Sequence, residues 1–279
     1  MSDFDFYPMM DEHARPSLVG LINATATSLL SENPMAACIG SGTFVCVGRV
    51  RGILTCGHGA DAAIRMDGFG ILYFPPDPTE HQTFQVTKRD VDPLVIGTPP
   101  FPDGGPDLGF LRLSDARAEA LAQLITPICF RQHHAKWHAP DPTNTIFEFV
   151  SGVVGEWTEA PVLGPARITR PLNALLNVGK IMRVYELAGY DYFSFTPVPG
   201  PGFKLPNSYS RMSGGPLWRF FVRRVGEEYT LAEHRLIGVA TDERHDGTMI
   251  CHGGHSVFGL LAAEMQKKWP DLGSMSPPD

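Results

Sequence analysis

This sequence has few cysteines and no closely spaced pair of them, which limits the kinds of protein it can be. The five cysteines stand at positions 38, 46, 56, 129 and 251, an odd number without any Cys-x-x-Cys spacing. Structural disulfides are therefore disfavoured. A disulfide between Cys46 and Cys56, on strands that could pair, stays open, but two buried thiols are favoured. A reducing, cytoplasmic location is the simplest interpretation.

The sequence also lacks long apolar runs and an excess of positive charge. No run reaches the ~20 apolar residues needed to cross a bilayer, and the acidic start Met-Ser-Asp-Phe-Asp-Phe has no signal-peptide features. The net charge of −7 argues against nucleic acid and against an anionic membrane surface as partners. With 43% hydrophobic and 19% charged residues, the composition is that of an ordinary globular protein.

Short β-prone runs separated by glycine, proline and aspartate fill most of the chain. They cover 42–48, 51–56, 70–75, 83–88, 107–113, 145–153, 181–187, 191–197, 217–224, 235–241 and 248–251. Many short strands at this spacing predict a sandwich or barrels rather than alternating strands and helices. The apolar spacing that follows Pro16 predicts a helix over 16–31. A second helix is predicted from its cap Ser256 to the stop at Pro270, and 270–279 is expected to be a loose tail.

Three segments carry residues that can act together chemically. His58 ends Leu54-Thr-Cys-Gly-His58, Asp107 precedes the apolar run Leu108–Leu113, and Ser213 is followed by Gly-Gly-Pro. A serine hydroxyl is a poor nucleophile near neutral pH unless a base such as histidine accepts its proton. A buried carboxylate can then fix the imidazole tautomer and stabilise the imidazolium. An aspartate at the mouth of a buried strand needs such a partner.

The ordered set Gly40–Val45, Leu54–His58, Asp107–Leu113 and Ser213–Leu217 resembles the trypsin-like, chymotrypsin-fold serine peptidases. The resemblance implies an all-β fold of two packed six-stranded antiparallel β-barrels, with an N-terminal and a C-terminal helix. In chain order, the expected parts are an N-terminal helical extension (1–37), a first barrel with His58 and Asp107 (38–125), a connection (126–144), a second barrel with Ser213 and the closing helix (145–269), and a tail (270–279).

The same resemblance implies roles for residues around the serine. Backbone N–H groups of Arg211 and Ser213 would form the oxyanion hole. Asn207 would lie near the floor of the specificity pocket, and the segment Ala240, Thr241 and Asp242 would bind the substrate backbone. Arg211 replaces a glycine whose backbone freedom helps to aim its N–H, and a misaimed donor costs about 10²–10³ in rate.

A second departure from the family pattern lies directly before the nucleophile. Met212 stands where a carboxylate usually precedes the serine, so activation by pairing with a released N-terminal amine is excluded.

Other polar clusters have simpler interpretations. The histidines of His133–His138 lack the spacing of a zinc site, so no metal and no organic cofactor is expected. His252 and His255 flank Gly253-Gly254 and are expected to be turn and cap residues, although His252 could line the cleft.

The function predicted from these residues is hydrolysis of peptide bonds through a Ser-His-Asp triad and an acyl-enzyme. The expected partners are a peptide or protein substrate and a regulatory protein, with no cofactor, nucleic acid or membrane. The alternative is a catalytically silent or locked module of the same fold that binds a peptide or protein. An esterase is disfavoured, because Arg211–Gly215 lacks the first glycine of Gly-x-Ser-x-Gly.

Overall fold

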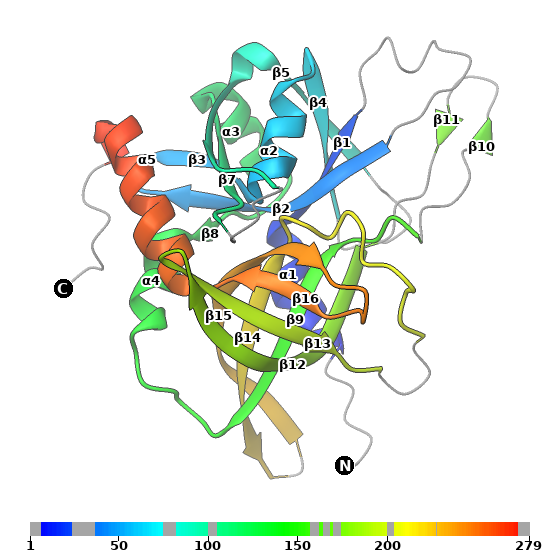
Figure 1. Ribbon diagram of the computed structural model, residues 1–279, viewed down its shortest axis with the longest axis vertical. Helices are drawn as coiled ribbons and strands as arrows, with labels where there is room; N and C mark the ends of the chain where they lie inside the picture. The colour runs from blue at the N-terminus through cyan, green and yellow to red at the C-terminus, as the bar shows by residue number, and fades with distance from the viewer. Residues whose placement is uncertain are drawn as a thin grey trace.

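The computed structural model shows two antiparallel β-sheet units, one carrying the first half of the chain and the other the second (Figure 1). It describes residues 7–23, 37–74, 82–99, 105–156, 162–163, 168–169, 174–199, 204–226 and 228–272. This is the all-β, two-unit arrangement that the resemblance to chymotrypsin-fold peptidases implied. Among the described residues, no helix is long and apolar enough to cross a bilayer.

The first unit is a strongly curled sheet with the strand order β5-β4-β1-β2-β3-β7-β6, and β8 pairs in parallel with β2. It therefore has more strands than the six that were predicted for the first barrel. Its strands are β1 (Leu18–Asn23), β2 (Ala37–Val47), β3 (Val50–Thr55), β4 (Gly68–Tyr73), β5 (Gln82–Thr87), β6 (Val91–Ile96), β7 (Leu108–Leu113) and β8 (Ile128–Cys129).

The second unit is a closed barrel of six strands, as predicted, in the order β12-β13-β16-β15-β14-β9. Its strands are β9 (Thr145–Val153), β12 (Ala174–Leu187), β13 (Tyr190–Pro197), β14 (Pro216–Val225), β15 (Glu228–Glu243) and β16 (Met249–His252). Closure leaves no free sheet edge and buries the inward-facing side chains of every strand. A separate short ribbon pairs β10 (Val162–Leu163) with β11 (Ile168–Thr169).

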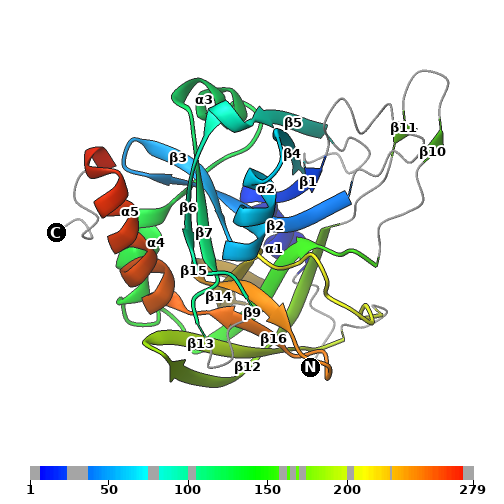
Figure 2. The same cartoon turned by 45° about the horizontal axis from the view of Figure 1, so that its top comes forward.

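Helices cover the ends and flanks of the two units. They are α1 (Tyr7–Ala14), η1 (Arg15–Ser17), α2 (Gly57–Ile64), η2 (Lys88–Asp90), α3 (Asp115–Ala122), α4 (Phe130–Trp137), the π-helical η3 (His255–Leu261), α5 (Ala262–Lys268) and η4 (Pro270–Leu272). Figure 2 shows α5 alongside both units. The Trp269 indole packs against Phe110 of β7, at 5.7 Å between ring centroids, and donates a hydrogen bond to Asp92 of β6. The closing helix therefore ties the end of the chain to the first sheet.

The predicted helix over 16–31 is wrong where the structure describes it. Leu18–Asn23 is strand β1, which pairs with β2 and β4 inside the first sheet, and 24–31 lies outside the described residues. Val19 and Leu21 pack in the core of that sheet, while Leu18 and Ile22 pack with Val153 of the barrel. A strand buried on both faces is an unbroken apolar run, and periodicity cannot separate such a run from a buried helix.

Two smaller expectations, at the start of the closing helix and after it, also need correction. Ser256 does not cap the closing helix with its own side chain; instead Asp191 of β13 accepts hydrogen bonds from the backbone N–H groups of His255 (3.0 Å) and Ser256 (2.6 Å). After the closing helix, Leu272 is buried in the main core, so 270–272 is part of the packed structure rather than a loose tail. The remainder of the predicted tail, 273–279, lies outside the described residues.

Candidate active site

His58 and Asp107 form a hydrogen-bonded pair at the edge of the first sheet where β3 ends and β7 begins. β3 ends at Thr55, and His58 is the second residue of α2, so its backbone N–H is free of the helical ladder. Asp107 immediately precedes β7, and its Oδ1 accepts the His58 backbone N–H at 2.8 Å. Its Oδ2 lies 2.8 Å from His58 Nδ1. Asp107 is only 6% exposed, so both oxygens of a buried carboxylate find donors on one residue.

The Asp107 contacts make the protonated form of His58 unusually stable. The pKa of His58 is raised to about 10, first by its hydrogen bond to Asp107 and then by the contact of its ring with Cys56. Burial acts in the opposite direction and lowers this pKa. The Cys56 Sγ atom lies 3.5 Å from His58 Nε2, the ring nitrogen that is not used by Asp107. Within the described part of the chain, no hydrogen bond joins Ser213 to this nitrogen.

The loop that carries Ser213 packs against β2 and the end of β3. Its carbonyl accepts the Ser41 backbone N–H at 2.8 Å, which fixes the serine loop to β2. The next residue, Gly214, has φ +90°, and a Cβ on it would lie 2.1 Å from Thr55 Oγ1 and 3.1 Å from the Cys56 backbone nitrogen. Only glycine fits that approach. The close contact packs the serine loop of the second unit against the end of β3 in the first unit, a few residues before His58.

The residue two before the serine adopts the backbone conformation of a glycine. Arg211 has φ +76°, a region that side chains other than glycine rarely occupy. The Met212 N–H donates to the Tyr209 carbonyl at 3.0 Å, and the Ser210 carbonyl accepts the Gly155 N–H at 2.9 Å. Because a trans peptide points its N–H opposite to its carbonyl, the Arg211 N–H points away from Gly155. Neither this N–H nor that of Ser213 has an acceptor among the described residues.

A cavity of about 280 Å³ opens beside Ser213. Its lining residues come from the serine loop and from β15 and β16: Tyr209, Ser210, Arg211, Ser213, Ala240, Asp242, Glu243 and Met249. The predicted substrate residues Ala240 and Asp242 are among them, and Thr241 is not, because its hydroxyl donates to the Ile250 carbonyl at 3.1 Å inside the barrel.

The backbone N–H and carbonyl of Ala240 both make hydrogen bonds within the protein. Its N–H donates to Gly215 at 2.8 Å and its carbonyl accepts from Gly214 at 2.7 Å, so it braces the serine loop instead of offering groups to a substrate.

Asn207 does not lie where the sequence placed it. Its side-chain amide donates to Glu156 Oε1 at 2.7 Å, and its backbone N–H donates to Glu156 Oε2 at 2.7 Å. The residue is exposed and does not line the cavity. Glu243, which was not among the predicted site residues, lines it instead and accepts hydrogen bonds from Ser208 Oγ and the Tyr209 N–H, both at 2.9 Å. The resemblance assumes the family's loop length before Ser213, and Asn207 lies elsewhere because this loop follows a different path.

Two residues of the barrel hold the segment that carries Asp107. His252 of β16 is fully buried, and its Nε2 accepts the Asp107 backbone N–H at 3.0 Å. Tyr192 of β13 donates its hydroxyl to the Gly105 carbonyl at 2.6 Å and packs on the His252 ring at 4.6 Å between centroids. Nothing in the sequence indicates this clamp, beyond the possibility that His252 lines the cleft. The histidine is a structural partner of the aspartate and not a turn residue.

None of the histidines of His133–His138 lines the cavity beside Ser213. His133 of α4 is buried, and its Nδ1 accepts the Leu236 N–H of β15 at 2.9 Å. Burial lowers its pKa to about 3, so the ring is neutral. Within the described residues, one group of potential metal ligands lies close together: an atom each of Cys56, His58 and Asp107, all within 4.8 Å of one another.

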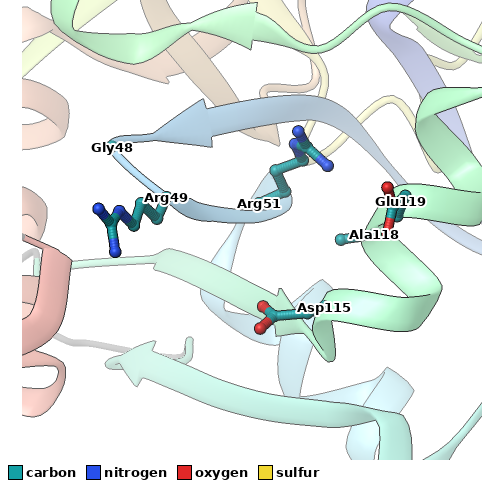
Figure 3. A pocket seen from close by; sticks show the side chains of 6 residues that line it. All are labelled: Gly48, Arg49, Arg51, Asp115, Ala118 and Glu119. Carbon is teal, nitrogen blue, oxygen red and sulfur yellow. The ribbon is translucent and has the colours of Figure 1, made fainter.

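A second cavity, of about 320 Å³, is lined by charged side chains of the β2–β3 turn and of α3. Figure 3 shows Arg49 and Arg51 pointing away from one another at this cavity, with Asp115 and Glu119 on the neighbouring helix. The charged groups do not converge on a common point, and no serine, cysteine or histidine lines the cavity. It is a solvated charged surface.

Comparison with known proteins finds distant likenesses. No protein-family model and no curated protein matches the sequence. Among solved structures, the HtrA-type protease AlgW with a decapeptide is 13% identical, with a TM-score of 0.47 over 96% of this chain and 69% of that chain. A structure described as "Structure of GrC" is 14% identical, with a TM-score of 0.45 over 91% of this chain and 96% of that chain. At these values neither likeness bears on the chemistry of the site.

Proposed function

We propose that this chain is a serine endopeptidase in which Ser213 is the nucleophile, His58 the general base and Asp107 the residue that orients the histidine. The observation that carries the proposal is the pair of 2.8 Å contacts between Asp107 and His58. These contacts lie beside a serine loop that packs against the end of β3. A carboxylate bound to Nδ1 leaves Nε2 as the nitrogen that exchanges protons with a nucleophile.

The proposed reaction has two matching halves. Ser213 Oγ attacks the carbonyl carbon of the scissile peptide while its proton passes to His58 Nε2. The tetrahedral intermediate then collapses, and the same proton moves from Nε2 to the leaving amine, which leaves an acyl group on Ser213. A water molecule repeats the attack and releases the acid. Asp107 remains ionised throughout and stabilises the imidazolium that forms between the two transfers.

The free N–H groups of Arg211 and Ser213 are the proposed oxyanion donors. They lie two residues apart, and neither has an acceptor within the described structure. The positive φ of Arg211 supports this role, because the arginine adopts the backbone turn for which a glycine is normally required. Donors that are aimed before the reaction need no rearrangement as charge develops on the carbonyl oxygen.

The proposal requires His58 Nε2 to leave Cys56. In the structure this nitrogen lies 3.5 Å from Cys56 Sγ, and the pKa of the ring is about 10, so the imidazolium dominates at neutral pH. A general base has to be neutral to accept a proton. When Nε2 turns from Cys56 to Ser213 Oγ, one of the causes that raise this pKa is removed.

Labelling of the purified chain with a fluorophosphonate tests the proposal. The probe should modify Ser213, as located by peptide mass spectrometry, and Ser213→Ala and His58→Ala should abolish the labelling. Ser210→Ala is the matched control, because it removes a hydroxyl from the same loop and should still permit labelling of Ser213. A folded protein that never labels at Ser213 would exclude the peptidase. Cleavage of a peptide library by the labelling-competent protein would identify the substrate class.

The second candidate function is a silent module that binds a peptide or protein without cleaving it. The contact between Cys56 and His58 Nε2 favours it, because the base faces a buried thiol rather than the serine. The cavity beside Ser213 would then bind the partner, with Asp242 and Glu243 as its acidic groups. A protein that captures peptides from the library, and neither labels nor cleaves, would establish this function instead.

A further inference from the structure

We propose that Cys56 and His58 bind a zinc ion, and that the bound ion blocks the base of the proposed peptidase. The binding depends only on the residues described above, whereas the blocking effect rests on the proposed function. The side chains of Cys56, His58 and Asp107, a thiol, an imidazole and a carboxylate, have potential ligand atoms within 4.8 Å of one another and are ligand types that zinc prefers in proteins.

The separation of the two donor atoms fits one ion between them. Zinc binds sulfur at about 2.3 Å and imidazole nitrogen at about 2.0–2.1 Å, and a tetrahedral angle between these bonds separates the two donors by about 3.5 Å. Cys56 Sγ and His58 Nε2 lie 3.5 Å apart. The spacing of the two atoms therefore matches that of a thiolate and an imidazole that bind one zinc ion.

Asp107 prepares the histidine for this role. A metal-binding imidazole commonly donates its other N–H to a carboxylate, which fixes the tautomer and orients the ring. Here Nδ1 lies 2.8 Å from Asp107 Oδ2, and the second carboxylate oxygen accepts the His58 backbone N–H. Both oxygens are thus engaged by His58, and Asp107 supports the ligand without binding the ion. Water would complete the coordination of the ion.

An ion can reach the site from the side of the histidine. The His58 side chain is 37% exposed, whereas Cys56 is fully buried behind it. On binding, the Cys56 thiol and Nε2 of the His58 imidazolium each lose a proton to solvent. Sulfur and nitrogen then each donate an electron pair to the ion, and no oxidation takes place. The ion then occupies the Nε2 lone pair that would accept the Ser213 proton.

The experiment measures zinc binding to the full chain directly, by competition with a chromogenic chelator. Cys46 and Cys129 lie directly opposite one another on paired strands, and two neighbouring thiols can also bind zinc. The measurement therefore uses the Cys46→Ser, Cys129→Ser double variant. One equivalent of zinc should bind in this background. Cys56→Ser and Cys56→Ala should each weaken binding at least tenfold, with circular dichroism confirming that both fold. Cobalt as a substitute should give a thiolate-to-metal absorption band that disappears in both variants.

The outcomes separate this proposal from the function of the site. Absence of zinc binding, or unchanged binding in both Cys56 variants, overturns the metal site. Binding to a protein that never labels at Ser213 supports the metal site and refutes the peptidase. If Ser213 does label, zinc should slow the reaction at least tenfold, and addition of a chelator should restore it. Labelling at an unchanged rate with zinc bound refutes the block.

Discussion

Replacing His252 by phenylalanine tests whether the barrel sets the position of Asp107. The variant keeps an aromatic ring against Tyr192, whose centroid lies 4.6 Å from that of His252, but it removes the nitrogen that accepts the Asp107 N–H at 3.0 Å. The buried N–H is then left without a partner. The matched variant His252→Gln loses the ring but retains a side-chain acceptor. Comparing the two variants separates the hydrogen bond from the packing.

The expected loss of stability can be worked from these contacts. An unpartnered buried N–H costs about 1–3 kcal/mol. Part of this cost is offset, because His252 Nδ1 itself has no hydrogen-bond partner in the described structure and phenylalanine removes that polar atom. The free energy of unfolding of His252→Phe should therefore fall by about 1–2 kcal/mol, measured by urea denaturation.

The second measurement is the rate of fluorophosphonate labelling at Ser213. Because Asp107 orients His58, a shifted Asp107 segment should slow labelling about tenfold or more in His252→Phe. Labelling should recover at least partly in His252→Gln. Val222→Ala, in a buried position of β14, provides a variant of similar instability whose labelling rate should not change. Wild-type labelling and wild-type stability in His252→Phe would refute the clamp. Equal slowing in Val222→Ala would show that lost stability alone explains the effect.

Three further changes probe other parts of the structure. Arg211→Gly should raise the free energy of unfolding by about 1 kcal/mol in urea denaturation, because glycine adopts the φ of +76° without strain, and a decrease would contradict this. Lowering the pH from 8 to 5 should cost about 2 kcal/mol through His133, since burial lowers its folded pKa to about 3 while its unfolded pKa stays near 6.5. The contribution is complete above pH 6.5 and is lost as the pH falls towards the folded pKa. Because the raised pKa of His58 changes stability in the opposite direction, the measurement compares wild type with His133→Gln in urea: wild type should lose about 2 kcal/mol more than the variant, and an equal loss would contradict it. Asp191→Ala should remove the acceptor at the start of η3 and destabilise the closing helix by about 1–2 kcal/mol. Faster amide exchange confined to 255–268 would reveal that change, and unchanged exchange there would count against it.

Expectations drawn from local pattern agreed best with the structure. Most predicted strands and the closing helix are present, because alternation and helix-end signals act over a few residues. The missed elements are those whose local pattern is ambiguous. β1 is an apolar run buried on both faces. The stretch that forms α4 lies in the predicted connection over 126–144, although its Phe130 and His133 are buried.

Positions that depend on loop length were predicted less well. The resemblance implies that Asn207, six residues before Ser213, lies near the floor of the specificity pocket, but its side chain bonds to Glu156 on a different segment. Glu243 lines the cavity because β15 continues to it. A count along the chain cannot give the path of a loop, since that path is set by the contacts its side chains find.

The sequence by itself determined the chemical types at the site and their order: a histidine after one strand, an aspartate before another and a serine in a glycine-rich loop. It could do so because a strand end and a tight turn are local features, visible in neighbouring residues. Only the tertiary structure decided what each group faces. His252 reaches Asp107 across 145 positions of sequence, and Cys56, two residues from His58, lies at Nε2 because α2 begins between them. Hydrogen-bond geometry of this kind depends on how the two sheets pack, and no short stretch of sequence contains that information.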